Sequence, residues 1–327
     1  MIALITNAFL SIVQAAIPAS AVVVLAATGA MVNEKVGVLN LGQEGLIGIG
    51  AVFTVLAVQV WEIESPWLCL LVGMSAAAAA GTLFAIATVV VRANQVLVGL
   101  ALTLGGIGLS NQLGTNRNGT PITVVFADLD PAGAFSGNQI TEAFFQHDPL
   151  AYIAYVFLPL VLWFLFYRTR HGLDLRAVGE SPATADATGT PVLTFRMLYT
   201  ILGCAISGAA GCYMILAFTP TWSQDIARGR GWVALAVVIL AAWRPFYVVL
   251  GALLYGAMIS LDQTTQARNW DLPFLEAKDV SFALAMLPYL VTLIAILVPA
   301  GLTRIGKRKS ARDAPGGLAV PYFREER

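Results

Sequence analysis

The chain has 327 residues, of which 58% are hydrophobic and only 12% are charged, and its mean hydropathy is +0.77. Soluble globular proteins carry roughly a quarter charged residues, so the composition excludes that class and predicts an all-α, polytopic membrane protein. The formal net charge is zero, which gives no reason to expect nucleic acid or another strongly charged partner.

Apolar runs approaching the roughly 20 residues that cross a bilayer follow one another along the chain. The first six cover residues 12–31, 39–61, 66–91, 95–113, 150–167 and 195–218. Residues 231–261 form one longer run that Arg244 and Pro245 interrupt, and we interpret it as two short spans. With a last span at 282–302, the sequence predicts about nine transmembrane helices, with eight or ten as the alternatives.

The distribution of Lys and Arg predicts the orientation, because cytoplasmic segments attract these residues. The tail after Leu302 holds seven of them, so we expect it to be cytoplasmic. With nine spans the amino terminus is then outside, the loop 168–192 is inside, and 14 of the 19 Lys and Arg residues lie inside. We therefore predict a permease domain at 1–303 and a basic cytoplasmic tail at 304–327.

The second run begins with the glycine-rich block GVLNLGQEGLIGIGA at residues 37–51. Asn40, Gln43 and Glu44 lie at its start, and polar groups within a membrane usually face a bundle interior or a water-filled path. The glycines permit either close helix packing or a broken helix that lines a cavity. The alternative is that Asn40 only caps the helix and Glu44 only complements its dipole.

Amides also flank the fourth run, at Asn94, Gln95 and Asn111. An amide can hydrogen-bond an uncharged polar solute without the desolvation cost of a buried charge, although the same residues also suit helix caps. Trp222 precedes the run at 231–261 and could stack on a ring-shaped solute or belong to an interfacial aromatic belt. These residues complete the candidate substrate path.

The polar loop 168–192 contains the signals of a short capped helix. Ser181 is an N-cap residue, Pro182 suits the first helical position, and Gly189 follows the end. A helix of about two turns buries too little surface to be stable alone, so we expect it to dock on neighbouring spans or on another protein.

No catalytic or metal-binding pattern is visible. The three cysteines, Cys69, Cys204 and Cys212, lie within apolar runs and are interpreted as packing residues. The segment GLTRIGK at 301–307 imitates a phosphate-binding loop, but Arg308 replaces the residue that would hold magnesium. We expect no enzyme activity, no metal and no cofactor in this chain.

Three blocks resemble the permease subunits of bacterial ABC importers: residues 37–51, GLDLRAVGESPATADATGTPV at 172–192, and GRGWVALAVVILAAWRP from Gly229. The similarity is to the nucleoside and simple-sugar branch of the branched-chain amino acid and ribose permeases. It implies a type II importer fold, with an inverted repeat suggested by the first and third blocks. The resemblance identifies a coupling helix in the loop 172–189, with these candidate contacts to an ATPase: Arg176, Glu180, Ser181, Pro182, Ala183 and Asp186.

The same resemblance implies the partners. They are an ATPase subunit that binds ATP and Mg²⁺, a second permease, often an unlike one, and an extracytoplasmic solute-binding protein, all at the bacterial inner membrane with its lipid. The predicted solute is a nucleoside ahead of a simple sugar. The alternative is an ion-coupled secondary transporter, for which Glu44 is the acidic residue expected within a span.

Overall fold

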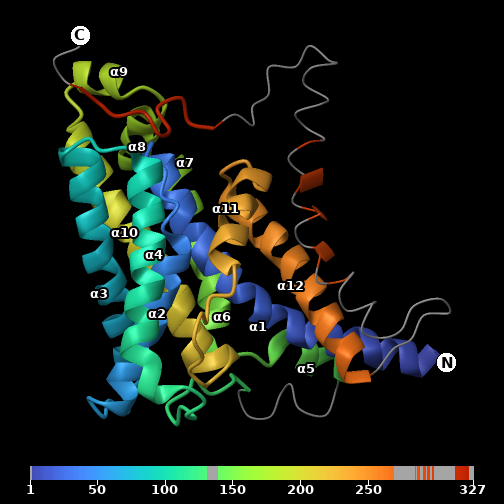
Figure 1. Cartoon of the computed structure of the whole chain (residues 1–327). Helices are drawn as coiled ribbons and strands as arrows, with labels where there is room; N and C mark the ends of the chain where they lie inside the picture. Colours follow the sequence, from blue (N-terminus) through green and yellow to red (C-terminus); the bar gives the residue numbers. More distant parts are fainter. Residues whose placement is uncertain are drawn as a thin grey trace.

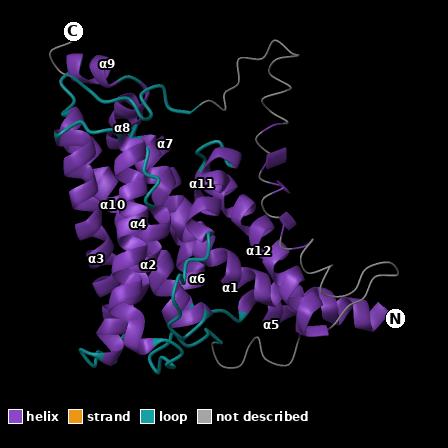
Figure 2. Cartoon of the chain, in the orientation of Figure 1, coloured by secondary structure: helices purple, strands orange, loops and turns teal. Residues whose placement is uncertain are grey.

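The structure is a computed structural model that describes residues 2–130, 139–268 and 314–323, with scattered residues between 284 and 297. Its regular elements are helices, as predicted, and one isolated bridge pairs Pro121 with Thr221 in the described part (Figures 1 and 2). The α-helices are α1 (Ile2–Lys35), α2 (Gln43–Gln59), α3 (Pro66–Ala85), α4 (Gln95–Gly114), α5 (Gln139–Phe145), α6 (Pro149–Tyr152), α7 (Leu158–Arg168), α8 (Arg170–Glu180), α9 (Pro182–Ala187), α10 (Val192–Tyr213), α11 (Arg230–Leu240) and α12 (Pro245–Arg268). Turns of π-helix extend α3, join α6 to α7, and extend α10.

Six helical segments of the described residues are long and apolar enough to cross a membrane. They match six of the predicted spans and include α12, the second half of the run at 231–261. In contrast, α2 has 17 residues and α11 has 11, so at 1.5 Å per residue they are only about 26 Å and 17 Å long. The last predicted span, 282–302, falls largely outside the described residues, and the count of nine stays a prediction.

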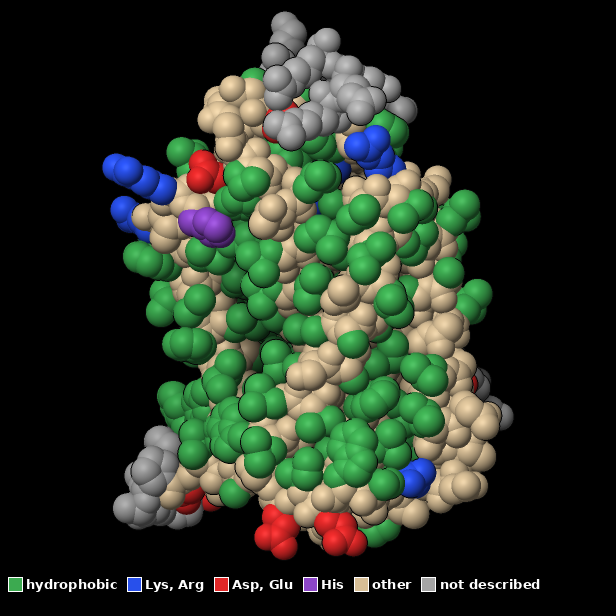
Figure 3. Space-filling view, turned by 90° about the vertical axis from the view of Figure 1, so that its left-hand side faces the viewer, with side chains coloured by type: hydrophobic (Ala, Val, Ile, Leu, Met, Phe, Trp, Pro, Cys, Tyr) green, Lys and Arg blue, Asp and Glu red, His purple; other side chains and the backbone are tan. Residues whose placement is uncertain are grey.

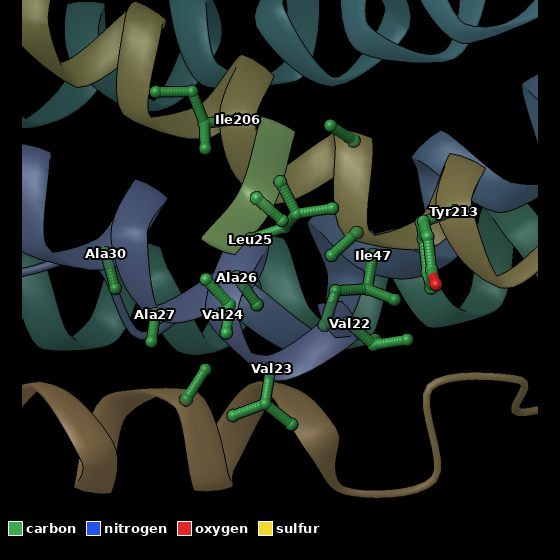
Figure 4. Packing of buried hydrophobic residues seen from close by; sticks show 14 of the residues in the cluster. Val22, Val23, Val24, Leu25, Ala26, Ala27, Ala30, Ile47, Ile206 and Tyr213 are labelled. Atoms are coloured by element: carbon green, nitrogen blue, oxygen red, sulfur yellow. The ribbon is translucent and has the colours of Figure 1, made fainter. Parts of the chain in front are cut away.

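Helix α1 lies at the centre of the bundle. Its residues Val22, Val23, Val24 and Leu25 point to different sides of the helix, and each is at most 2% exposed (Figure 4). A helix that is apolar all round is stable only when other helices surround it. The neighbours here include α10 and α12, which pack along its length.

The molecule has two distinct ends, separated by an apolar band (Figure 3). Helices α8 and α9 lie at one end together with the tail segment 314–323, and α5 with the loops 60–65 and 115–130 lies at the other (Figure 1). Exposed leucines such as Leu83 and Leu104, each more than 70% exposed, belong to the band. Apolar side chains are stable in such numbers on a surface that faces lipid.

Two segments of irregular backbone lead into the short helices. Residues 36–42 follow α1 at the α8–α9 end, and α2 then continues to the opposite end, where Gln59 donates to Thr120. Residues 219–229 start at that opposite end, and α11 returns toward the α8–α9 end. The helices α2 and α11 therefore run in opposite directions with their amino termini facing each other. The sequence placed a complete span at 39–61, but its helix begins only at Gln43.

Candidate functional site

The amino termini of α2 and α11 meet at a carboxylate. Glu44, 6% exposed in the first turn of α2, accepts the backbone N–H of Gly229 at 2.5 Å through Oε1 and that of Gly231 at 2.7 Å through Oε2. These N–H groups belong to the start of α11, where the helix dipole is positive and no intrahelical partner exists. We call this meeting point, with residues 36–42 and 219–229, the joint.

Glycine is required on the α11 side of the joint. Gly229 has a φ of +82°, a left-handed conformation that favours glycine. A Cβ atom at Gly231 would collide with the backbone of Glu44. The block at 229–231 therefore brings the α11 backbone close enough for one side chain of α2 to bond it twice.

Helix α4 holds both irregular segments. Near its start, Oε1 of Gln95 accepts the N–H of Leu39 at 2.7 Å, and Thr103 donates to the carbonyl of Leu41 at 2.8 Å. Near its end, Asn111 and Asp225 form two reciprocal hydrogen bonds of 2.8 and 3.0 Å. The amides predicted at the two ends of this helix thus bind the two segments that enter the joint from opposite sides.

The glycines of α2 serve close packing. Gly45 lies against the backbone of α4 at Leu102 and Thr103, and Gly106 of α4 lies against the backbone of Gly45. Small residues permit such approach between membrane helices. Of the two uses that the sequence left open, the helix break is confined to residues 36–42, while the glycines inside α2 provide contact.

Two amides in the joint keep a polar atom without a partner among the described residues. Gln43 is fully buried, and its Nε2 donates to the carbonyl of Asn40 at 3.4 Å while its Oε1 has no donor. Gln95 uses its Oε1 on Leu39 and leaves its Nε2 unpaired. Buried polar atoms are almost always bonded, so these two atoms stand out as unsatisfied polar groups next to the joint.

The other predicted path residues separate in space. Asn40 is buried, accepts the N–H of Gly42 at 2.8 Å and donates to Cys204, so it fixes the loop before α2. Asn94 is exposed and caps α4 through Val96 and Leu97. Asn111 follows Gln95 by 16 residues, about 24 Å along the helix. The seven residues do not form one cluster.

Trp222 is 1% exposed and its ring lies against Gly114 of α4. This position differs from both interpretations of the sequence, because the ring faces neither the lipid interface nor an open path. The reason is the bridge between Pro121 and Thr221 together with the bond from the N–H of Gly119 to the Trp222 carbonyl, which fold the outer loop over the residue.

Sequence reasoning missed two polar groups at the end of α1, because it ended the first run at Met31. The helix continues to Lys35, so Asn33 and Glu34 are both buried. Glu34 accepts the indole N–H of Trp243 at 2.5 Å. The signal was present, since no glycine or proline lies between Met31 and Gly37. Glu44 is therefore not the only acidic residue buried among the apolar helices.

The predicted coupling helix is present as α9, Pro182–Ala187. Pro182 occupies its first turn, Ser181 precedes it in an extended conformation and contacts the hydroxyl of Thr184 at 2.8 Å, and Gly189 follows with a φ of +89°. Ala183 is exposed on its surface, whereas Ala185 packs inward and Asp186 is partly buried. The preceding residues form a further helix, α8, which the sequence did not predict.

Arg176 and Glu180 of α8 have partners within the chain. The guanidinium of Arg176 lies over the ring of Tyr167, 5.1 Å from its centre. Glu180 is exposed and accepts the N–H of Gly316 at 3.3 Å. The carboxylate predicted to contact another subunit is thus placed beside the chain's own tail.

The tail segment 314–323 is part of this end of the molecule. The N–H of Gly317 donates to the carbonyl of Gly179 at 2.9 Å, and the buried Arg196 of α10 donates to the carbonyls of Val320 and Gly317 at 2.9 and 3.3 Å. Arg196 lies near the start of the predicted run 195–218 and within the spanning segment Val192–Phe218. Tail carbonyls accept hydrogen bonds from two of its guanidinium nitrogens, which offsets part of the cost of burying its charge.

No group of side chains suited to a metal ion occurs among the described residues. The three cysteines are buried and free, as predicted. Cys212 contacts the carbonyls of Gly50, Leu70 and Gly208, so it packs three helices together.

Residues 11–301 match the family model described as branched-chain amino acid transport system permease component. TsgC13 of Haloferax volcanii, named provisionally as a glucose ABC transporter permease protein, is 34% identical over 96% of this chain and 98% of its own. NupQ of Bacillus subtilis, a guanosine ABC transporter permease protein, is 28% identical over 97% of each chain. NupC of Lactococcus lactis, a nucleoside ABC transporter permease protein, is 28% identical over 82% of this chain and 85% of its own.

No solved structure gives a significant match to the chain. The family match nevertheless covers most of the residues that the structure describes, including α2, α4, the α8–α9 end and α11. The three relatives named above are all permease proteins of ABC transporters. This chain therefore belongs to the branched-chain amino acid transport system permease family and is a membrane-spanning, non-catalytic subunit of an ABC transporter.

Proposed function

We propose that this chain forms the translocation path of an importer for an uncharged polar solute, a nucleoside ahead of a simple sugar. The observation that carries the proposal is the joint, where two irregular segments and the ends of two short helices place buried amides among apolar helices. Membrane proteins keep irregular backbone at depth where it is enclosed by protein or lines a cavity.

The solute class follows from the groups in the joint. The unpaired Oε1 of Gln43 and Nε2 of Gln95 offer one acceptor and one donor, which suit a hydroxyl group or a nucleobase edge. Both oxygens of Glu44 accept N–H groups of α11, so this carboxylate has structural partners, and the unpaired atoms beside it belong to neutral amides. The printed names of the relatives, two for nucleosides and one for glucose, support the same class.

Coupling to ATP hydrolysis would occur at the α8–α9 end. An ATPase subunit, which binds ATP and Mg²⁺, would dock on the exposed surface of α9 around Ala183 and on Glu180. This places α8, α9 and the tail in the cytoplasm and the amino terminus outside, consistent with the excess of Lys and Arg near this end. A second permease and a solute-binding protein would complete the importer at the inner membrane.

The test is uptake by proteoliposomes that contain the permease with its co-expressed ATPase and binding protein. Labelled nucleosides, pentoses, hexoses and branched-chain amino acids are compared, and we expect a nucleoside or a sugar to be taken up with ATP. Gln43→Ala should lower uptake about two- to tenfold, the effect of one hydrogen bond. Gln112→Ala, an exposed amide on α4, is the matched control and should have no effect.

Two outcomes would contradict the proposal. Preference for an amino acid would exclude the solute class, and wild-type uptake by Gln43→Ala would remove this residue from the path. Uptake that follows an ion gradient without the ATPase would instead support the ion-coupled alternative.

A further inference from the structure

A cavity of about 520 Å³ opens at the α8–α9 end between the end of α1, helix α7 and the turn that joins α11 to α12. It is distinct from the joint, and the transport mechanism proposed above does not use it. Its lining combines two cations with four aromatic side chains: Lys35, Arg244, Trp163, Tyr167, Phe246 and Tyr247. We propose that this cavity binds the phosphate group of an anionic membrane lipid.

The cations of the cavity lack ionic partners. Neither Lys35 nor Arg244 forms an ion pair or a side-chain hydrogen bond within the described chain, and each lies over an aromatic ring, Lys35 on Tyr167 at 6.0 Å and Arg244 on Tyr247 at 5.6 Å. Arg168 lies over the ring of Trp163, 5.3 Å from its centre, and Arg176 lies over the same Tyr167 ring as Lys35. Several cations held close together attract a multiply hydrogen-bonding anion such as phosphate.

Nearby carboxylates do not neutralise this cluster. Glu34, next to Lys35 in sequence, is buried and occupied by the indole of Trp243. Glu180, exposed on α8, attracts Lys35, but Arg176 and Arg244 repel Lys35 more strongly, so the cluster keeps an excess of positive charge. The amino terminus of α12, which starts at Pro245 in the cavity wall, adds the positive end of a 24-residue helix.

A second cavity shows why the phosphate should belong to a lipid. This groove of about 410 Å³ shares Ala242, Arg244 and Tyr247 with the first cavity and continues along α12. Below Arg244 its walls are apolar, formed by Leu240, Leu250, Gly251 and Leu254. Leu250 is 60% exposed and Leu254 is 45% exposed, so the groove opens on the apolar surface.

A polar cavity that continues into an apolar groove has the shape of a headgroup followed by an acyl chain. Basic sites at the cytoplasmic ends of membrane helices recognise anionic headgroups in this way. Aromatic residues at the rim, such as Tyr247 and Phe246, suit the level of the headgroups. A free phosphate ion would gain nothing from the groove.

The test measures lipid that remains bound to the purified permease after exchange into detergent with a fixed amount of added phosphatidylglycerol. Native mass spectrometry gives the number of bound lipids per chain. Since one cation near a phosphate contributes about a fivefold gain in binding, Arg244→Gln should lower retention about fivefold and the double variant with Lys35→Gln roughly 25-fold. Phosphatidylcholine, which has no net charge, should be retained poorly by every variant.

Arg170→Gln is the matched control for charge, because Arg170 is an exposed arginine at the same end that does not line the cavity. Leu254→Asn should also lower retention, whereas Leu104→Asn, a control on the exposed face of α4, should not. Thermal unfolding of each variant shows whether the chain is folded, and the comparison is restricted to folded variants.

Three results would overturn the inference. Equal retention of phosphatidylglycerol by the double variant and by Arg170→Gln would show that the cavity does not bind the headgroup. Displacement of the lipid by inorganic phosphate or glycerol phosphate at equal concentration would assign the cavity to a soluble anion. Retention of phosphatidylcholine equal to that of phosphatidylglycerol would show that the cavity does not select lipids by charge. Each readout is binding, so a failure here is separate from a failure of the transport proposal.

Discussion

The joint and the α8–α9 end use polar residues in opposite ways. At the joint, Glu44 is buried and its carboxylate oxygens bond the start of another helix. At the α8–α9 end, Glu180 and Ala183 are exposed, and the end of α8 is also bonded by a tail segment more than 100 residues further along the chain. The joint fixes a geometry, and the other end presents a surface that a partner can contact.

The difference has a physical basis. Inside a membrane an unpaired backbone N–H has no water to bond, so the start of α11 needs an internal acceptor. At the water-exposed end the same groups can be satisfied by solvent, and the side chains are free to serve an interface. Removal of the Glu44 carboxylate should therefore damage the fold, whereas a substitution on the exposed surface of the α8–α9 end should damage coupling.

The largest effect is expected for Glu44→Ala, which removes both acceptors from the amino terminus of α11. Hydrogen bonds to a charged group contribute about 1.5–3 kcal/mol each, so the free energy of unfolding should fall by several kcal/mol. Glu44→Gln keeps one acceptor oxygen and should be intermediate. Thermal unfolding in detergent ranks the three proteins, and an unchanged melting temperature for Glu44→Ala would refute the role of the joint.

Charge reversal at the α8–α9 end should abolish transport without unfolding the chain. Arg176→Glu and Glu180→Arg would place the wrong charge against an ATPase, and such unpaired interfacial charges cost about 2–5 kcal/mol. Ala183→Trp is a sharper variant, because Ala183 is exposed on α9 and a large ring there obstructs docking. Uptake and membrane abundance are measured together.

The coupling assignment fails if uptake stays at the wild-type rate in all three variants. Loss of membrane abundance in Ala183→Trp would also count against it, since that would indicate a structural role for the surface. Ala185→Trp is the useful contrast, because Ala185 is buried and its replacement should reduce abundance itself.

A matched glycine pair tests the packing beneath the joint. A Cβ at Gly106 would collide with the backbone of Gly45, whereas one at Gly105 meets no atom within 4 Å. Gly106→Ala should lower the free energy of unfolding by about 1–3 kcal/mol through overpacking. Gly105→Ala should raise it by up to about 1 kcal/mol, since alanine favours a helix. Equal effects would show that α2 and α4 are not in close contact.

Much of this architecture could be predicted because its signals are local. Ser181, Pro182 and Gly189 are neighbours in sequence, and they mark the ends of α9 where the structure has them. Long apolar runs likewise predicted the six spanning segments. Gln95 and Asn111 were expected to bind solute or to cap their helix, and their bonds to Leu39 and Asp225 were not foreseen.

What could not be predicted depends on contacts between distant residues. Glu44 bonds residues more than 180 positions away, and Arg196 bonds a tail more than 120 positions away. Neither pairing leaves a trace in local periodicity. Trp222 was misplaced for the same reason, since its burial depends on a loop from the other side of the sequence.

The smallest effect is expected at the end opposite α8 and α9, where His147 is 5% exposed and lines a cavity together with Asp128 and Asp148. Burial lowers the pKa of His147 below its ordinary 6.5, although both aspartates oppose this shift. The unfolded chain therefore binds the proton more readily, so stability should be lost as the pH falls through about 6.5. Burial raises the pKa of Asp128, so the folded chain binds that proton more readily than the unfolded chain. Its contribution therefore increases stability as the pH falls, but only in the lower range where aspartate titrates. Between pH 7.5 and 6 the melting temperature should fall by at most about 1 °C, because one histidine with an unfolded pKa of 6.5 loses less than about 1 kcal/mol over this range. His147→Gln should remove this decrease. His171→Gln, which changes an exposed histidine at the other end, is the control and should keep it. If both variants show the same decrease, groups other than His147 cause it.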